Sequence, residues 1–302
     1  TWRFPSGRGN RYYPICHRNH HKKTEKSPMK KILIICVNYN SYDALQSFLE
    51  SIDCAAKTAV DTCLVNVWIA DNSSEKQTVK LSAYQYAQYE YFACDNDGYI
   101  GSAEKLLQAN SWEEIQKYDY IIISNVDIYL SPSSFNQLCT VTDQNIGWIV
   151  PRIYATCRHS EDNPQAIYRY TKTKLQLLHF LYSHPTFYHW YRKTARVILQ
   201  RHRNSYTPAL QNRQKIYAGN GSIFIFTKPF IQSAFHFHYP CFLYGEELFF
   251  AELVQRHNLN TVYFPNIYVE NRTPNVSTKE LGIEKRCYYS KIALEYILKT
   301  FY

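Results

Sequence analysis

The sequence predicts an α/β fold in which a mixed, mostly parallel β-sheet is flanked by helices. Two observations support this fold class. In the first half of the chain, apolar runs rich in Val and Ile alternate with helix-like segments, and each run is continuously apolar. Strands with this composition are buried on both faces, and parallel strands need crossover segments between them. The chain has 302 residues, of which 45% are hydrophobic, so it can form a large core.

Four strands separated by helical or polar segments are expected in the first half. The strands are 31–38, 63–72, 89–96 and 118–130. Helices are expected over 43–57 and 101–118, and the segment before the third strand is polar. Right-handed crossovers place the carboxyl ends of such strands at one edge of the sheet, where open α/β sheets bind ligands.

The second half contains a basic, aromatic segment, 154–215, which we interpret as a helical insertion in a single domain over 29–302. Pro185 should divide it into two helices, since proline interrupts a helix. One face of the first helix can hold Leu177, Leu178, Leu181 and Tyr182, and one face of the second can hold Trp190, Thr194, Val197 and Ile198. Beyond the insertion we expect strands at 216–227, 261–264 and 267–271, helical segments at 228–235 and 241–259, and a final helix at about 277–300.

Residues 1–28 differ in composition from the rest of the chain. They are polar and basic and lack periodicity, and Met29 stands directly before the first expected strand. We interpret them as a disordered or non-native leader. A genuine basic arm for nucleic acid or anionic lipid is the alternative.

The positive charge is local. Of the net charge of +9, residues 1–28 account for +6, and residues 151–217 hold twelve Lys or Arg against Glu161 and Asp162. This distribution argues against a nucleic-acid-binding protein. No apolar run reaches the roughly 18 residues of a membrane span, and the nine cysteines form no CxxC pair. Reduced thiols in a cytoplasmic protein are the expected consequence.

Polar residues follow each of the four strands of the first half. The tips are Asn38-Tyr39-Asn40, Asp71-Asn72-Ser73-Ser74, Asp95-Asn96-Asp97-Gly98 and Asn125-Val126-Asp127. Each one alone indicates a turn, but four at one sheet edge indicate a polar cleft. The sequence has no GxGxxG or GxxxxGK[ST] motif, which argues against a Rossmann dinucleotide site and a P-loop.

The order of these motifs resembles that of a known enzyme family. "VNYN", "ADNSS", "DNDGYIG", "SNVDI", "GNGSIFIF" and "YGEELFFAEL" follow one another between about residues 30 and 272. The arrangement is similar to family 2 glycosyltransferases of the GT-A (Rossmann-like) fold, and within them to the bacterial rhamnosyltransferase-like branch of surface polysaccharide biosynthesis. The resemblance implies an inverting transfer of sugar from a UDP- or dTDP-sugar to a saccharide acceptor, lipid-linked, at the cytoplasmic side of the membrane.

The resemblance also implies roles for residues at the strand tips. Asp71 would accept the N3–H of the nucleotide base, with Asn38 and Tyr39 bordering the same pocket. The loop residues Asn96, Gly98 and Gly101 would lie close to the diphosphate, where glycine permits close backbone approach. Asn220, between Gly219 and Gly221, would approach the donor sugar or the acceptor. For each of these, ordinary turn chemistry is the alternative.

Asp127 corresponds to the last carboxylate of the family's DxD-type motif, which binds a divalent ion, Mg²⁺ or Mn²⁺. The first acidic position of that motif is Asn125, which could contact the ribose or a metal-bound water. The family often supplies a late histidine to the metal, but Asn271 occupies that place, beside Glu270. The third ligand and strict metal dependence are therefore open.

The "GEE" motif should supply the general base. The resemblance assigns Glu247 to this role and makes Glu246 its partner or alternative. Two acids at a helix start also favour the helix dipole without any chemistry.

Two rival functions and one contact surface remain open. The rivals are a GT-A-like binding protein with impaired catalysis and a sugar nucleotidyltransferase, although the phosphate loop expected of the latter is absent. Residues 174–203, which include Arg192, Lys193, Arg196 and Arg203, are a candidate for peripheral contact with the membrane or for acceptor pyrophosphate. The alternative is a helical pair packed on the sheet with a solvated basic face.

Overall fold

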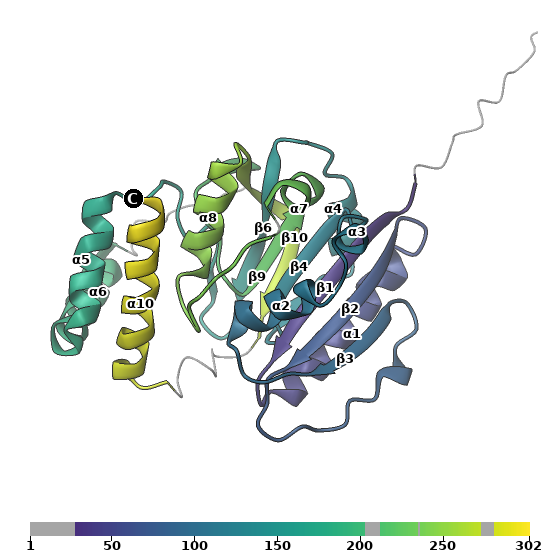
Figure 1. The fold of residues 1–302 in the computed structure, drawn as a ribbon, viewed down its shortest axis with the longest axis horizontal. Coiled ribbons are helices and arrows are strands. Elements are labelled where there is room, and N and C mark those ends of the chain that lie inside the picture. Colours follow the sequence, from purple (N-terminus) through teal and green to yellow (C-terminus); the bar gives the residue numbers. More distant parts are fainter. Residues whose placement is uncertain (1–27, 203–211, 235, 273–280) are drawn as a thin grey trace, which may run out of the picture.

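The computed structural model describes residues 28–202, 212–234, 236–272 and 281–302, and it shows an α/β fold (Figure 1). The strands are β1 Lys30–Asn38, β2 Cys63–Asp71, β3 Gln88–Ala93, β4 Tyr120–Asn125, β5 Ile128–Leu130, β6 Ile146–Ala155, β7 Ser160–Glu161, β8 Gln214–Ile216, β9 Ile223–Thr227 and β10 Asn260–Asn271. The helices are α1 Tyr42–Thr58, α2 Tyr99–Gln108, α3 Trp112–Ile115, α4 Ser134–Cys139, α5 Lys172–Ser183, α6 Pro185–His202, α7 Lys228–Ala234, α8 Glu246–Arg256 and α10 Ile283–Phe301, with a short 3₁₀ turn at Leu81–Ala83. The expected leader lies outside the described residues, except for Pro28.

The sheet is mixed and mostly parallel, as the sequence predicts. Its strand order is β3-β2-β1-β4-β9-β6-β10-β5, with β7 beside β6 and β8 beside β10. The pairings make β3, β2, β1, β4, β6 and β10 run in one direction, whereas β9 and β5 run in the other. The end of β10 therefore lies at the same edge as the ends of β1, β2 and β4.

Alternate residues of β1 face two different hydrophobic layers, as expected for a strand covered on both faces. Leu33, Ile35 and Val37 pack with side chains of α2, α8 and α10. Ile32, Ile34 and Cys36 pack with side chains of α1 and α4 on the other face. The core thus holds the central strands rigidly, and their polar ends emerge at one edge.

The predicted strands differ from those observed in three places. The run 118–130 divides into β4 and β5, which lie at different positions in the sheet. The run 216–227 is interrupted after β8, because Asn220 accepts hydrogen bonds from the backbone N–H and the hydroxyl of Ser222 and forms a turn before β9. The two runs at 261–264 and 267–271 form one strand, β10, with a register shift between Phe264 and Tyr268. That irregularity contains Pro265, which has no N–H for the ladder. The expected start of the last helix, at 277, lies outside the described residues.

The segment 154–215 contains α5 and α6, with Pro185 as the first residue of α6, and both helices pack against α10 at one end of the molecule (Figure 1). The predicted apolar face of the first helix is wrong in one respect. Leu175 is fully buried and Leu178 packs on the core, but Leu177 is exposed because the contact face is centred on 175, 178 and 182. Trp190 is also exposed. Among the described helices, none is both long enough and apolar enough to cross a membrane.

Candidate functional site

A pocket of about 350 Å³ opens at the carboxyl edge of the parallel strands. Five of the residues that line it were predicted as site residues: Tyr39, Asn96, Gly98, Asn125 and Asp127. The others are Val37, Ser41, Ala44, Asn72, Tyr99, Val126, Phe242, Leu243, Leu281 and Lys285. The volume suits a nucleotide-sized ligand, and the lining combines an exposed tyrosine ring with amide, carboxylate and ammonium groups.

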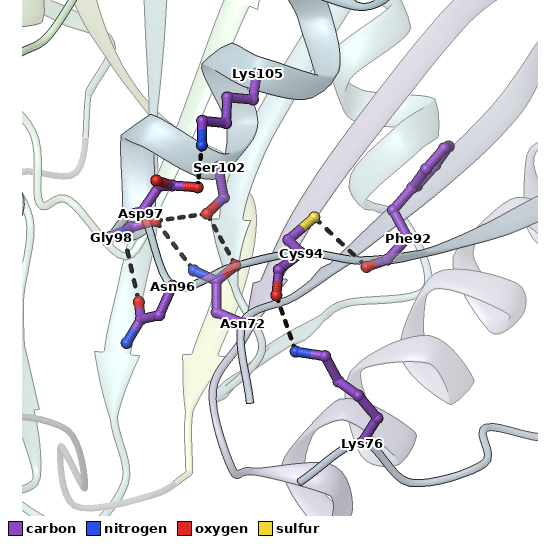
Figure 2. Close-up of polar contacts among 9 residues, drawn as sticks. All are labelled: Asn72, Lys76, Phe92, Cys94, Asn96, Asp97, Gly98, Ser102 and Lys105. Atoms are coloured by element: carbon purple, nitrogen blue, oxygen red, sulfur yellow. Dashed lines mark hydrogen bonds and ion pairs between the residues drawn. The ribbon is translucent and has the colours of Figure 1, made fainter. Parts of the chain in front are cut away.

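The loop between β3 and α2 is held in shape by its own side chains and by those of neighbouring segments (Figure 2). Gly98 has a φ of +84°, and its N–H donates to Oδ1 of Asn96. Its carbonyl accepts hydrogen bonds from Nδ2 of Asn72, at 3.1 Å, and from the hydroxyl of Ser102, at 2.9 Å. A β-carbon at Gly98 would lie 2.0 Å from the carbonyl oxygen of Phe242. Glycine is thus required both by the backbone conformation and by the approach of the segment before α8.

Asp71 lies beneath this pocket and does not line it. Its side chain is fully buried, and its carboxylate accepts five hydrogen bonds of 2.5 to 3.1 Å. The donors are the amide of Asn38, the backbone N–H and hydroxyl of Ser73, and the hydroxyls of Tyr42 and Tyr91. Burial would raise the pKa of Asp71, but the hydrogen bonds from Ser73, Tyr42 and Tyr91 hold it below its usual value. The carboxylate is therefore already occupied and orders the strand ends from below.

Asn38 belongs to the same buried network. Its Nδ2 donates to Asp71 and Ser73, and its Oδ1 accepts from the N–H of Ser41. Tyr39, the next residue, is 44% exposed at the pocket. Of the two, Tyr39 presents the surface against which a planar ring could stack.

Asp127 lies between β4 and β5, on the pocket wall, and burial raises the pKa of its carboxyl group. Asn271, at the end of β10, pairs with Ile128 of β5. Because Ile128 directly follows Asp127 in the sequence, this pairing brings the backbone of Asn271 near that of Asp127. Its Oδ1 is buried and has no hydrogen-bond partner among the described residues. A buried amide oxygen without a hydrogen-bond partner is a ligand type that Mg²⁺ and Mn²⁺ accept, as is a carboxylate.

The donor set nevertheless remains sparse. Among the residues that the structure describes, no group of three His, Cys, Asp or Glu side chains could hold a metal ion. Asp127 would supply the full charge, and Asn271 or Asn125 would supply amide oxygens. Such a set fits a divalent ion that takes its remaining ligands from a bound phosphate or from water.

Glu246 and Glu247 begin α8 and differ in their surroundings. Glu246 is buried, and its carboxylate accepts a hydrogen bond of 2.9 Å from the N–H of Tyr244. Burial, and then the charge of Glu247, raise the pKa of Glu246 to about 8. Glu247 is partly exposed, and burial raises its pKa while the backbone amides of Glu247 and Gly221 oppose that rise. Glu246 is thus engaged within its own turn, whereas Glu247 is accessible.

Tyr99 is affected by the charges of Asp127 and of both glutamates, Glu246 and Glu247. It lines the pocket, and its hydroxyl donates to the carbonyl of Ile123. Burial raises its pKa well above the usual value, and the charges of Glu246, Asp127 and Glu247 add to that rise. The charges of all three carboxylates thus act on one phenol that lines the pocket.

The remaining predicted residues support the pocket from outside its lining. Gly101 is in the first turn of α2, and a β-carbon there would meet only Cβ of Asp97, at 3.4 Å. Asn220 accepts from Ser222 through its side chain, and its N–H donates to Oδ1 of the buried Asn163. The side chain of Asn220 thus forms a turn, and neither Gly101 nor Asn220 lines the pocket.

Three further residues at this site were not predicted as site residues from the sequence. Lys285, in the first turn of α10, lines the pocket and has no hydrogen bond or ion pair among the described residues. The sequence predicts Asn72 only as part of a polar strand tip, and no motif includes Lys76. The ammonium of Lys76 donates to the carbonyls of Asp71, Ser73 and Cys94 and so joins the ends of β2 and β3 (Figure 2). No local sequence signal marks Lys285, because α10 lies far along the chain from the strands whose ends form the pocket.

No protein-family profile and no curated protein matches the chain. Solved structures do match it. The structure of S. aureus TarS 1–349 in complex with UDP-GlcNAc superposes with a TM-score of 0.50 and 10% identity, over 82% of this chain and 60% of that one. The structure of GalNAc-T7 with UDP, GalNAc and Mn²⁺ superposes with the same score and identity, over 82% of this chain and 44% of that one.

These neighbours are glycosyltransferases of the GT-A type, and the predicted fold class is confirmed. This chain spans only 60% of the length of the TarS 1–349 structure and less of GalNAc-T7. At 10% identity the likeness concerns the fold alone.

Proposed function

We propose that this protein is a glycosyltransferase that moves a sugar from a nucleotide-diphosphate donor to a saccharide acceptor with inversion at the anomeric carbon. The observation that carries the proposal is the joint placement of a pocket lined by Tyr39, Asp127 and Lys285 and an accessible carboxylate, Glu247, at one edge of a GT-A sheet. The solved neighbours bound to UDP and UDP-GlcNAc support the same class of donor, UDP- or dTDP-sugar.

The base of the donor would lie against Tyr39, where an exposed aromatic ring offers stacking. Asn72 and Asn96 also line the pocket and would offer amide groups to the donor. Because the carboxylate of Asp71 is buried and already accepts five hydrogen bonds, we assign it to positioning of the pocket floor rather than to contact with the base. Asn38 has the same role through its bonds to Asp71 and Ser41.

The diphosphate would lie between Asp127 and Lys285, with the turn at Gly98 beneath it. The ammonium of Lys285 would offset part of its negative charge as the leaving group departs. A divalent ion, when bound by Asp127 and the amide oxygen of Asn271 or Asn125, would neutralise the same charge. The GalNAc-T7 neighbour was solved with Mn²⁺, which supports this cofactor class.

Glu247 would act as the general base. It takes the proton of the attacking acceptor hydroxyl while the new C–O bond forms at the anomeric carbon and the bond to the diphosphate breaks. Glu246 holds the start of α8 through its hydrogen bond to Tyr244. Its protonated state would limit the repulsion between the two adjacent acids.

The acceptor, the biosynthetic pathway and the membrane contact are also proposals. The resemblance to the rhamnosyltransferase-like branch favours a lipid-linked saccharide acceptor in surface polysaccharide biosynthesis, such as capsule or O-antigen, on the cytoplasmic face of a membrane. Membrane contact through residues 174–203 would bring enzyme and acceptor together. Arg196 lies in α6 where side chains are not described, and Arg203 lies outside the described residues.

A two-step experiment tests the function. Calorimetry with UDP, dTDP, GDP and ADP, with and without Mn²⁺, identifies the base, and turnover of a matching panel of nucleotide sugars identifies the donor. We expect one nucleoside diphosphate to bind, and Glu247→Gln to lose roughly 10²–10⁴-fold in turnover while it keeps that binding. Glu295→Gln, an exposed acid on α10, is the matched control. Binding without turnover of any sugar would favour the impaired binding protein, and no nucleotide binding would overturn the proposal.

A further inference from the structure

Aromatic and aliphatic side chains gather, exposed, at the corner between α5 and α6. They are Leu177, Phe180, His184, Phe187, Trp190 and Tyr191, which we call the α5–α6 ridge. The exposed fractions include 52% for Phe180, 58% for Phe187 and 71% for Trp190. Apolar side chains exposed singly need no explanation, but a contiguous group indicates a contact surface.

The ridge is continuous across the corner. The rings of Phe180 and His184 lie 4.6 Å apart, and those of His184 and Phe187 lie 5.8 Å apart. Leu177 precedes Phe180 by three residues on α5, and Trp190 and Tyr191 follow Phe187 by three and four residues on α6. Residues at these spacings share a helix face. The two helices thus present one apolar surface rather than scattered side chains.

Basic side chains flank the ridge without acidic partners in their own segment. No Asp or Glu occurs from residue 163 to residue 245. Arg192 and Lys193 stand on α6 beside Trp190 and Tyr191, and Lys172 and Lys174 stand on α5. On the packed neighbour α10, Glu284 borders the hollow between α6 and α10. The local charge is therefore strongly positive.

We propose that the α5–α6 ridge docks on an anionic lipid bilayer. Tyr and Trp side chains suit the bilayer interface because one end of each ring system is apolar and the other is polar. Lys and Arg beside them are attracted by anionic headgroups. The corner belongs to a helical group that lies at one end of the molecule (Figure 1), so it can enter an interface without disturbing the sheet.

The ridge also lies near the mouth of the donor pocket. Lys285 lines that pocket and also a hollow of about 670 Å³ formed with Pro185, Thr186 and His189 of α6. The start of α6, which carries Phe187, is thus next to the pocket. A docked ridge would hold the pocket at the bilayer surface, within reach of an acceptor whose saccharide is carried on a lipid. This orientation rests on the proposed glycosyl transfer, whereas the lipid contact itself does not.

Vesicle sedimentation tests the docking. We expect the full chain to sediment with phosphatidylglycerol vesicles, to sediment less with phosphatidylcholine vesicles, and to be released by high salt. Arg192→Ala with Lys193→Ala should lower the partition coefficient roughly 30-fold on anionic vesicles. Phe187→Ser with Trp190→Ser should abolish binding to both. The controls are Lys57→Ala with Lys80→Ala, and Leu64→Ser with Tyr86→Ser, which remove exposed residues of the same types elsewhere.

Fluorescence identifies the inserted residue. Trp190 should be quenched by brominated acyl chains, and Trp190→Phe should keep vesicle binding while that quenching is lost. Calorimetry with the nucleoside diphosphate on the same samples separates the two proposals, since ridge variants should bind it as the unchanged chain does.

Equal vesicle binding by ridge and control variants would overturn the docking, as would no binding at all. A change from dimer to monomer in the ridge variants, without lipid binding, would show that a second copy covers the ridge instead.

Discussion

A β-carbon on Gly221 would lie 2.7 Å from Oε1 of Glu247 and 3.1 Å from its Cδ. The backbone amide of Gly221 also stabilises the charged form of that carboxyl group and opposes the rise of its pKa. The turn before β9 and the first turn of α8 therefore fix the position of the proposed base together. Glycine at 221 thus leaves room for the carboxylate of Glu247.

Gly221→Ala should displace Glu247 and leave the fold intact, because the atoms in the way are the far end of a flexible side chain. A base displaced by about 1 Å costs on the order of 10²-fold in turnover. We therefore expect kcat to fall by about that factor while the Kd of the nucleoside diphosphate and the melting temperature stay nearly constant. Steady-state kinetics, calorimetry and thermal unfolding measure the three quantities.

Gly219→Ala supplies the contrast two residues away. A β-carbon there would lie 2.6 Å from both Cγ atoms of Val150, inside the core. This variant should lose about 1–3 kcal/mol of unfolding free energy through overpacking. If Gly221→Ala is destabilised in the same way and its remaining folded fraction is fully active, the proposed link between Gly221 and Glu247 is wrong.

Glu246→Gln should change how stability depends on pH. The pKa of Glu246 is about 8 in the folded chain, above the value of 4.5 that applies when it is exposed. The folded state then binds more protons, so this contribution to stability is fully present below about pH 4.5 and is lost as the pH rises through about 8. Gln keeps an acceptor for the N–H of Tyr244 and cannot ionise. We expect the variant to melt above the unchanged chain at pH 8.5, and the difference to shrink by pH 5.

Glu295→Gln is the matched control for that profile, since Glu295 is exposed on α10. Its melting temperature should follow that of the unchanged chain at every pH. A constant offset between Glu246→Gln and the unchanged chain across the whole range would contradict the buried, protonated state of Glu246.

The fold could be predicted because its signals are local. The continuous apolar runs of β1, β2 and β4 and the polar residues at their ends are visible in the sequence, and chain direction then places Tyr39 and Asp127 at one edge. The same reasoning located Glu247 at a helix start. These predictions need only the period of a strand, the position of a turn and the handedness of a crossover.

The environment of Asp71 could not be predicted in the same way. Two of its five hydrogen bonds come from Tyr42 and Tyr91, on α1 and β3, and no sequence pattern indicates that two phenols meet one carboxylate. Lys285 reaches the pocket from α10. Its position depends on how the last helix packs on α5 and α8, which is a tertiary property of the chain.

Mn²⁺ should bind this protein weakly alone and more tightly with the nucleoside diphosphate. Asp127 supplies one charged ligand and Asn271 an amide oxygen, so the phosphates must complete the shell. In calorimetry, Asp127→Asn should abolish the gain in nucleotide affinity that Mn²⁺ gives, and Asn271→Ala should reduce it. Asp61→Asn, at an exposed site, is the control. A gain that survives Asp127→Asn would place the ion elsewhere.

Lys285→Met should weaken binding of the diphosphate selectively. The ammonium lines the pocket and has no partner among the described residues, so its charge is available to the ligand. Because the side chain is exposed, the loss should be modest, on the order of 1 kcal/mol or roughly fivefold in Kd at low salt, and smaller at high salt.

Uridine or thymidine, which lack phosphates, should bind the variant as they bind the unchanged chain. Lys291→Met, on the same helix, controls for the change in net charge. An equal loss for nucleoside and diphosphate, or for Lys291→Met, would show that Lys285 does not contact the phosphates.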